Sequence, residues 1–297
     1  MFELSRMQER VKADRQGRGS GLALVLVLLI TVAGPSMLAA QDTFSPLLDR
    51  YSFTLGSYFT QVNSDVQANN PETGFGEKVD FETDLKFGNS DELFRLEGQF
   101  ILKRRHQINV AYYDLNRSAS NTITREIEWR ERVFPVSAEV EGFFNTEVVE
   151  LSYTYWWIAR DKVVFGVNGG IQMIGIDVGV DLVERTAGTL AADLGVNEPV
   201  PLIGFEVRSK LTDKLMFRGI GRFVSVSDLG DLSKVSVTDF SVGLEHRTFG
   251  TGGFGIAYKA LDIDLEIEKD LPLNRKLTGG VDYGFGGVEV FLRFWFK

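Results

Sequence analysis

Charged residues recur at every second position within several apolar stretches of this chain. Arg95 and Glu97 alternate with apolar residues, and so do Glu289 and Arg293 near the C-terminus. A β-strand directs successive side chains to opposite faces, so this spacing gathers charge on one face and hydrocarbon on the other. By this rule we expect ten charged side chains to line an interior: Arg95, Glu97, Glu150, Glu206, Arg208, Lys210, Arg218, Arg222, Glu289 and Arg293.

Such an interior row of charges has two possible uses. Isolated buried ions are costly, so the charges must pair, and a fully paired set forms a rigid plug. An incompletely paired set forms a polar constriction that selects small solutes. Arg208, Lys210, Arg218 and Arg222 lie on two consecutive predicted strands, and any selection by this cluster would favour anions.

Hydrolytic chemistry requires a base positioned against a nucleophile and an orienting acid. The chain has two histidines, His106 in a predicted turn and His246 near the end of a predicted strand. Neither has a credible serine partner in its sequence context. We therefore expect no enzyme, with His106 a solvated turn residue and His246 an interface or interior residue.

Metal binding finds little support in these residue types. Two histidines and no cysteine cannot form a zinc site of the usual kinds. Asp262, Asp264 and Glu266 share one strand face and could bind Ca²⁺ through oxygen atoms. A solvated strand face explains the same row more simply, so no metal and no cofactor is expected.

The elements that must position these residues are strands. Strict alternation recurs about ten times, near residues 50–62, 93–103, 108–112, 148–158, 163–183, 203–211, 217–223, 235–246, 254–268 and in a last strand ending at 296. Tight turns at 104–106, 159–162, 212–214 and 250–253 alternate with longer polar segments at 63–92, 117–145, 185–199, 227–234 and 269–280. This alternation is typical of membrane β-barrels. The predicted fold is all-β: a transmembrane, antiparallel, up-and-down barrel of about ten strands, with eight or twelve as alternatives.

Two irregularities accompany the pattern. Residues 79–87 also alternate, but a spanning strand there would break the parity of the turns, so we assign them to the first external excursion, as an extension of the sheet. The apolar phase slips near Met173–Ile174, Thr238 and Ala260, either at bulges or where a strand leaves lipid. For 163–183 we favour the second explanation, since that strand exceeds a span of ~9–11 residues.

The N-terminus reads as an export signal. A basic leader precedes the aliphatic stretch Leu22–Val32, which is shorter than the ~20 residues of a spanning helix, and small residues follow up to Ala40. The predicted organisation is a signal peptide over 1–40, a short periplasmic segment over 41–49 and a barrel over 50–297. The absence of cysteine excludes a disulfide framework, and the net charge of −9 argues against a nucleic-acid partner.

From about residue 48 to 297 the chain resembles the OmpW-like and OmpA-like small outer-membrane barrels. The resemblance rests on the leader, on Tyr51-Ser-Phe-Thr-Leu-Gly-Ser-Tyr-Phe and on the closing Phe-Leu-Arg-Phe-Trp-Phe, although Lys297 follows the expected terminal aromatic Phe296. It implies a Gram-negative outer-membrane location, contact with membrane lipid and lipopolysaccharide, and insertion by the barrel-assembly machinery. Aromatic residues near the turns are expected to form an interfacial girdle: Tyr155, Trp156, Trp157, Phe217, Phe294 and Trp295.

The resemblance implies a narrow passive channel for small, often apolar, molecules or a structural envelope protein. Two alternatives remain open. One is a membrane-embedded lipid-modifying enzyme of the deacylase or acyltransferase type, and the other is a receptor or adhesion barrel that uses the 117–145 excursion.

Overall fold

The computed structural model describes residues 45–69, 76–88, 90–129, 132–183, 192–229, 232–271 and 275–296. The predicted signal peptide and its cleavage site lie outside these residues. The strands of the described part are β1 (Tyr51–Ala68), β2 (Lys78–Asp80), β3 (Ser90–Leu102), β4 (His106–Thr122), β5 (Ile127–Trp129), β6 (Arg132–Phe134), β7 (Glu139–Ala159), β8 (Val163–Leu182), β9 (Ala192–Lys210), β10 (Leu215–Leu229), β11 (Leu232–Phe249), β12 (Gly252–Leu271) and β13 (Arg275–Phe296).

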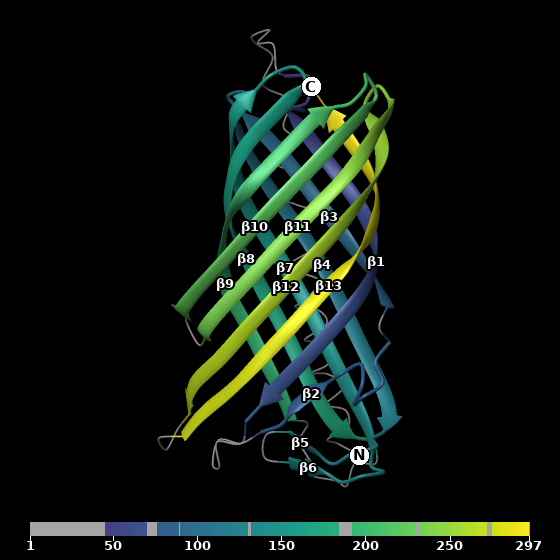
Figure 1. The fold of residues 1–297 in the computed structure, drawn as a ribbon, viewed down its shortest axis with the longest axis vertical. Helices are drawn as coiled ribbons and strands as arrows, with labels where there is room; N and C mark the ends of the chain where they lie inside the picture. Colours follow the sequence, from purple (N-terminus) through teal and green to yellow (C-terminus); the bar gives the residue numbers. More distant parts are fainter. Residues whose placement is uncertain are drawn as a thin grey trace, which may run out of the picture. The chain divides into compact units, whose positions relative to one another are not determined.

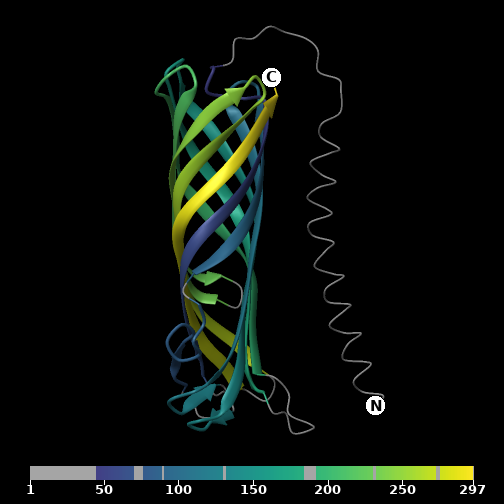
Figure 2. The same cartoon turned by 90° about the vertical axis from the view of Figure 1, so that its right-hand side faces the viewer.

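Ten of these strands form a closed antiparallel ring. The order runs β1, β3, β4, β7, β8, β9, β10, β11, β12, β13, and β13 pairs back onto β1 from Tyr51↔Phe296 to Ala68↔Gly279. Figure 2 shows the first and last ring strands side by side, and Figure 1 shows the shared tilt of the strands. The predicted ten-stranded up-and-down barrel is confirmed. Closure matters because it removes the unpaired edges that lipid cannot satisfy.

An apolar belt surrounds the part of the ring nearest the short turns. On β13, for example, the outward residues from Val288 to Phe296 are all apolar and exposed, over a length close to the ~9–11 residues of a tilted spanning strand. No helix among the described residues has the length and apolar character needed to cross a membrane. The fold is that of an outer-membrane β-barrel. Its belt includes Leu55, Phe59, Phe94, Leu151, Tyr153, Ile171, Met173, Ile203, Phe205, Phe223, Phe240, Leu244, Ile256, Tyr258, Val290 and Leu292.

Beyond the belt the polarity of the wall inverts. Outward positions become polar, as at Asn63, Asn116 and Asp262, while inward positions become apolar and form a buried core. Strand pairing continues without a shift through Met173–Ile174, Thr238 and Ala260. The phase slips therefore mark the level at which the strands leave the lipid belt, and the bulge explanation is wrong for all three. The inward core residues include Val62, Val66, Ile174, Ile176, Val178, Val180, Val235, Val237, Leu261, Ile263, Leu265 and Ile267.

The strands extend much further than predicted on the long-loop side. β4 continues to Thr122 and β7 starts at Glu139, so both ends of the 117–145 excursion are barrel wall. Likewise β9 begins at Ala192, inside the predicted 185–199 loop. The predicted strands are too short on this side, because polar outward residues in a membrane barrel usually indicate loops. Here they belong to a barrel wall that is exposed to water.

Residues 78–88 behave differently from the predicted sheet extension. Only Lys78–Asp80 pairs with β1, and the chain then turns inward so that Phe81, Leu85 and Phe87 are buried in the core. The buried Arg117 fixes this segment by contacting Glu82 at 2.7 Å and the carbonyl of Gly88 at 2.7 Å. The small β5–β6 hairpin adds Ile127, Trp129 and Phe134 to the same core.

The ring is complete only at the level of the belt. β9 and β10 pair from Ile203↔Phe223 to Lys210↔Met216, yet β9 starts at Ala192 and β10 continues to Leu229. The part of β9 that pairs with β8 but not with β10 contains Pro199 and Pro201, which lack the N–H that a neighbouring strand would bind. We call this separation the β9–β10 seam. Above the belt the described wall thus has a built-in break in its hydrogen bonding.

Candidate functional site in the barrel interior

Three layers of side chains occupy the interior along the barrel. The apolar core described above occupies the long-loop side, and a set of charged residues occupies the level of the belt. A second, smaller apolar cluster lies at the short-turn end and contains Leu47, Leu48, Trp156, Val164 and Met216. Most of the buried charge lies in the layer that the belt surrounds, because outward positions there are apolar and only inward positions can be polar.

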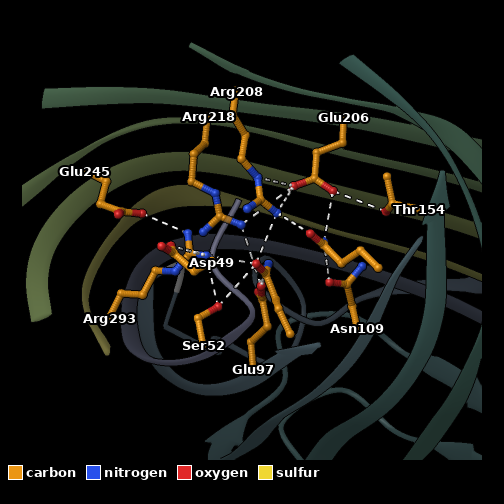
Figure 3. A network of polar contacts seen from close by, with 12 residues as sticks. Asp49, Ser52, Glu97, Asn109, Thr154, Glu206, Arg208, Arg218, Glu245 and Arg293 are labelled. Carbon is orange, nitrogen blue, oxygen red and sulfur yellow. Dashed lines mark hydrogen bonds and ion pairs between the residues drawn. The ribbon is translucent and has the colours of Figure 1, made fainter. Parts of the chain in front are cut away.

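One half of the charged layer is centred on Arg208, which is almost fully buried (Figure 3). Its guanidinium binds Glu206 at 2.6 Å and the side-chain oxygen of Gln107 at 2.9 Å, and it lies over the Trp156 ring at 4.8 Å. Arg293 approaches from the opposite wall and binds Glu245 at 2.9 Å. Both arginines donate to the Gln99 side chain, so this amide joins the two ion pairs into one network.

The other half of the layer shares each arginine between two carboxylates. Arg222 contacts Glu150 at 2.8 Å and also pairs with Asp239. Arg95 pairs with Glu97 and lies 3.3 Å from Glu289. Planar guanidinium groups suit such double pairing because their donors point in fixed directions.

The charges of this layer balance. The described residues contribute seven cations and seven carboxylates to it and to its short-turn rim, and most are paired at short range. The cations expected to favour anions thus lie among an equal number of carboxylates. The cations are Arg95, Arg208, Arg218, Arg222, Arg247, Lys259 and Arg293, and the carboxylates are Asp49, Glu97, Glu150, Glu206, Asp239, Glu245 and Glu289.

A cavity of about 70 Å³ lies within the charged layer, enough for a few water molecules. Two of its lining cations lack a close carboxylate among the described residues. Arg218 is 3.8 Å from both Glu97 and Glu206, and Lys259 lies over the rings of Tyr58 at 5.3 Å and Tyr113 at 6.0 Å. Cation–π contacts of this kind stabilise an ammonium group that has no ion-pair partner.

The segment before β1 closes the short-turn end. Leu47 and Leu48 are buried in the small apolar cluster, and Ser45 donates to the carbonyl of Arg160 at 2.9 Å. Asp49 binds Arg247 at 2.6 Å and lies 3.6 Å from Arg293. The described part of the predicted periplasmic segment is thus folded into the barrel mouth.

Nine of the ten charged residues expected inside lie on inward faces, and Lys210 does not belong with them. Lys210 is at the last position of β9, where its ammonium binds the exposed Asp213 of the adjacent turn at 2.7 Å. Five members of the layer and its rim were missed: Asp49, Asp239, Glu245, Arg247 and Lys259. Continuing the alternation from Phe240 and Leu244 would have found the three on β11, whereas Asp49 precedes the first strand and gave no signal.

The aromatic girdle is confirmed in part. Tyr155, Trp157 and Phe294 are exposed at the short-turn end and Phe217 is half-exposed on the outward face. Trp156 and Trp295 are buried instead, because adjacent strand residues face opposite sides. Trp295 lies under Arg247, with 4.5 Å between the guanidinium carbon and the ring centroid.

The histidines lie outside the interior. His106 begins β4 rather than lying in a turn, and its Nδ1 is 2.5 Å from the Tyr153 hydroxyl, while His246 is 3.0 Å from the Thr248 hydroxyl. On β12, Asp264 and Glu266 face outward above the belt and are bound by Lys234. Within the described ranges, no group of three or more acidic or histidine side chains is arranged to hold a metal ion.

Comparison with known proteins gives no family. No protein-family model and no curated protein matches this chain. Solved structures with a similar trace include the toluene transporter TbuX of Ralstonia pickettii, with 10% identity, coverage of 89% of this chain and 94% of that chain, and a TM-score of 0.38. The outer membrane protein OprG of Pseudomonas aeruginosa has 12% identity, coverage of 84% and 98%, and a TM-score of 0.36. At such identities and TM-scores the similarity carries no argument about function.

Proposed function

We propose that this protein is a sealed barrel of the Gram-negative outer membrane that acts as a structural envelope protein. The carrying observation is that three layers of side chains fill the interior in succession along the barrel. The short-turn end would face the periplasm, and the apolar-cored part beyond the belt would stand outside the cell in contact with lipopolysaccharide. Insertion by the barrel-assembly machinery belongs to the same proposal.

Conductance tests the sealed interior. The purified protein, inserted in a planar lipid bilayer under an applied voltage, is expected to show no current above the lipid baseline. The matched control replaces two ion pairs together, with Arg208, Glu206, Arg293 and Glu245 all changed to serine, which preserves net charge and removes the large side chains of one half of the layer. Current in this variant and none in the native protein supports a plug. A steady current through the native protein overturns it.

The β9–β10 seam favours one second candidate, a passage for small apolar molecules between the outer core and the membrane. The seam begins where Ile203 and Phe223 end the paired region, and both side chains are exposed at the outer border of the belt. Val224, Val226 and Leu229 on β10 pack against the core and are only partly buried. An apolar molecule leaving the core would therefore meet lipid at this border.

Cysteine chemistry tests the seam directly, because the native chain has no cysteine. The double variant Leu202→Cys/Val224→Cys, joined by a short bismaleimide, is expected to stop uptake of a fluorescent apolar dye into proteoliposomes. The control Val207→Cys/Gly219→Cys lies where the strands already pair, and bridging it is expected to change nothing. Equal uptake before and after bridging at the seam removes this candidate.

The remaining alternatives lack a supporting contact. An acyl-transferring enzyme would require a histidine against a nucleophile, and the side-chain hydrogen bonds of His106 and His246 in the described residues are to Tyr153 and Thr248. For a receptor function of the 117–145 excursion, the observation in its described part is the exposure of Val133 and Val136.

A further inference from the structure

The lipid-facing surface of the barrel is hollowed over β10, β11 and β12. A groove of about 430 Å³ lies there, walled by Phe217, Val242, Leu244, Ile256, Tyr258 and Val288. Its walls are hydrocarbon except for the tyrosine hydroxyl. A groove of this size can hold part of one hydrocarbon chain.

The sequence explains the hollow. On β10 the outward position paired with Val242 is Gly219, which has no side chain to fill the space beside Phe217. The floor is the backbone of Gly243 and Ala257, small residues whose other side bounds the interior cavity. A Cβ on Gly243 would come within 2.6 Å of the Ala257 Cβ, so the wall here is as thin as a strand pair allows.

The groove lies in the half of the belt nearest the short turns. On β10 it adjoins Phe217 and not Phe223, and on β11 it lies at Val242 and Leu244 and not at Phe240. Lys214 immediately precedes β10, about 10 Å along the strand from Phe217 at the usual rise per residue. Among the described residues Lys214 has no ion pair, since the nearby Asp213 is bound by Lys210.

We propose that this groove binds one acyl chain of a phospholipid from the periplasmic leaflet, with the lipid phosphate at Lys214. The inference rests on the membrane location in the proposed function, and it is independent of whether the interior is sealed. Every lipid of the bilayer competes for this groove, and all of them offer the same hydrocarbon. Selectivity must therefore come from van der Waals fit in the groove and from the ammonium–phosphate contact. The occupant is therefore a bilayer phospholipid rather than a soluble apolar molecule.

Native mass spectrometry tests the site with defined lipid. The detergent-purified protein is mixed with phosphatidylethanolamine or, separately, with lipid A, and the protein with retained lipid is weighed. We expect one phosphatidylethanolamine per barrel. In Val242→Phe, which fills the groove, retention is expected to fall about tenfold because the chain loses its packing contacts.

Matched controls separate the groove from the belt in general. Val167→Phe enlarges a lipid-facing valine on β8, remote from the groove, and is expected to retain the lipid. Lys214→Gln is expected to weaken retention, and Lys162→Gln at another short turn is not. Equal retention in Val242→Phe and Val167→Phe, preference for lipid A, or a dimer in place of a lipid adduct would overturn the proposal. None of these results bears on the conductance test. A failure of the lipid proposal can therefore be distinguished from a failure of the proposed function.

Discussion

Met173 and Ile174 are neighbours in β8 that face opposite environments. Met173 is 39% exposed on the lipid belt, whereas Ile174 is 1% exposed in the outer core. Strand pairing runs through both without a shift, so the backbone does not change where the apolar face changes sides. The same barrel wall thus separates lipid from a polar interior at the level of the belt, and water from an apolar interior beyond it.

Beyond the belt, where the polarity of the wall is inverted, the stability of the barrel is expected to depend on inward residues alone. Ile263 and Asp262 are adjacent on β12, one fully buried and one exposed. Ile263→Ala is expected to lower the free energy of unfolding by about 2–5 kcal/mol, the usual cost of emptying a core site. Asp262→Ala is expected to change it by less than about 0.5 kcal/mol. Urea unfolding followed by tryptophan fluorescence measures both, since Trp129 lies in this core; equal effects would contradict the inversion.

The charged layer is expected to be intolerant of single changes. Arg222→Met leaves Glu150 and Asp239 buried without their cation, at an expected cost of about 3–5 kcal/mol. Changing all three together, with Glu150→Gln and Asp239→Asn added, removes the unpaired charge and is expected to recover most of that loss. Denaturant midpoints of the single and triple variants give the comparison. A single variant as stable as the native protein would mean that Arg222 is not the group that holds these carboxylates.

A short turn offers a stabilising change. Lys103 and Arg104 have φ of 47° and 66° between β3 and β4, a conformation in which a side chain is strained. Lys103→Gly is expected to raise the free energy of unfolding by about 1 kcal/mol, because glycine adopts positive φ without that strain. Lys162→Gly, at a short turn without this conformation, serves as the control. A lower melting temperature for Lys103→Gly than for the native protein would contradict this prediction.

Acid is expected to loosen the inward-folded segment outside the belt. Burial alone would raise the pKa of Asp84, but hydrogen bonds from Arg125 at 2.8 Å and from the Asp80 amide at 3.0 Å outweigh burial, so the pKa lies below its usual value. A carboxyl of this kind contributes stability above its unfolded pKa of ~3.9 and loses it as the pH falls through the lower folded value.

Hydrogen exchange measures this loss. Protection of residues 76–88, corrected for intrinsic rates, is expected to fall below about pH 4 in the native protein. In Asp84→Asn the protection is expected to be weaker at neutral pH and to lack this acid-dependent step. A step of the same size in both proteins would show that Asp84 is not the group that titrates.

Local periodicity was sufficient for the fold and for most of the interior. Alternation decides which face a residue takes, and it does so from neighbours in the chain, so ten strands and nine inward charges could be named without a structure. The same rule predicted the level at which β8 leaves lipid. It wrongly included Lys210 among the interior residues, because alternation gives the face of a residue and not its height along the barrel, and Lys210 lies at the rim.

The tertiary structure alone decided what those residues do together. Arg222 meets Glu150 across 72 positions of sequence, and Arg95 meets Glu289 across 194, so ring closure and register determine the partners. The burial of Phe81 and the closure of the short-turn end by Leu47 and Leu48 also depend on which distant segment lies beside them. The sequence carries no local signal for these contacts, whereas Pro199 and Pro201 mark the β9–β10 seam within the chain itself.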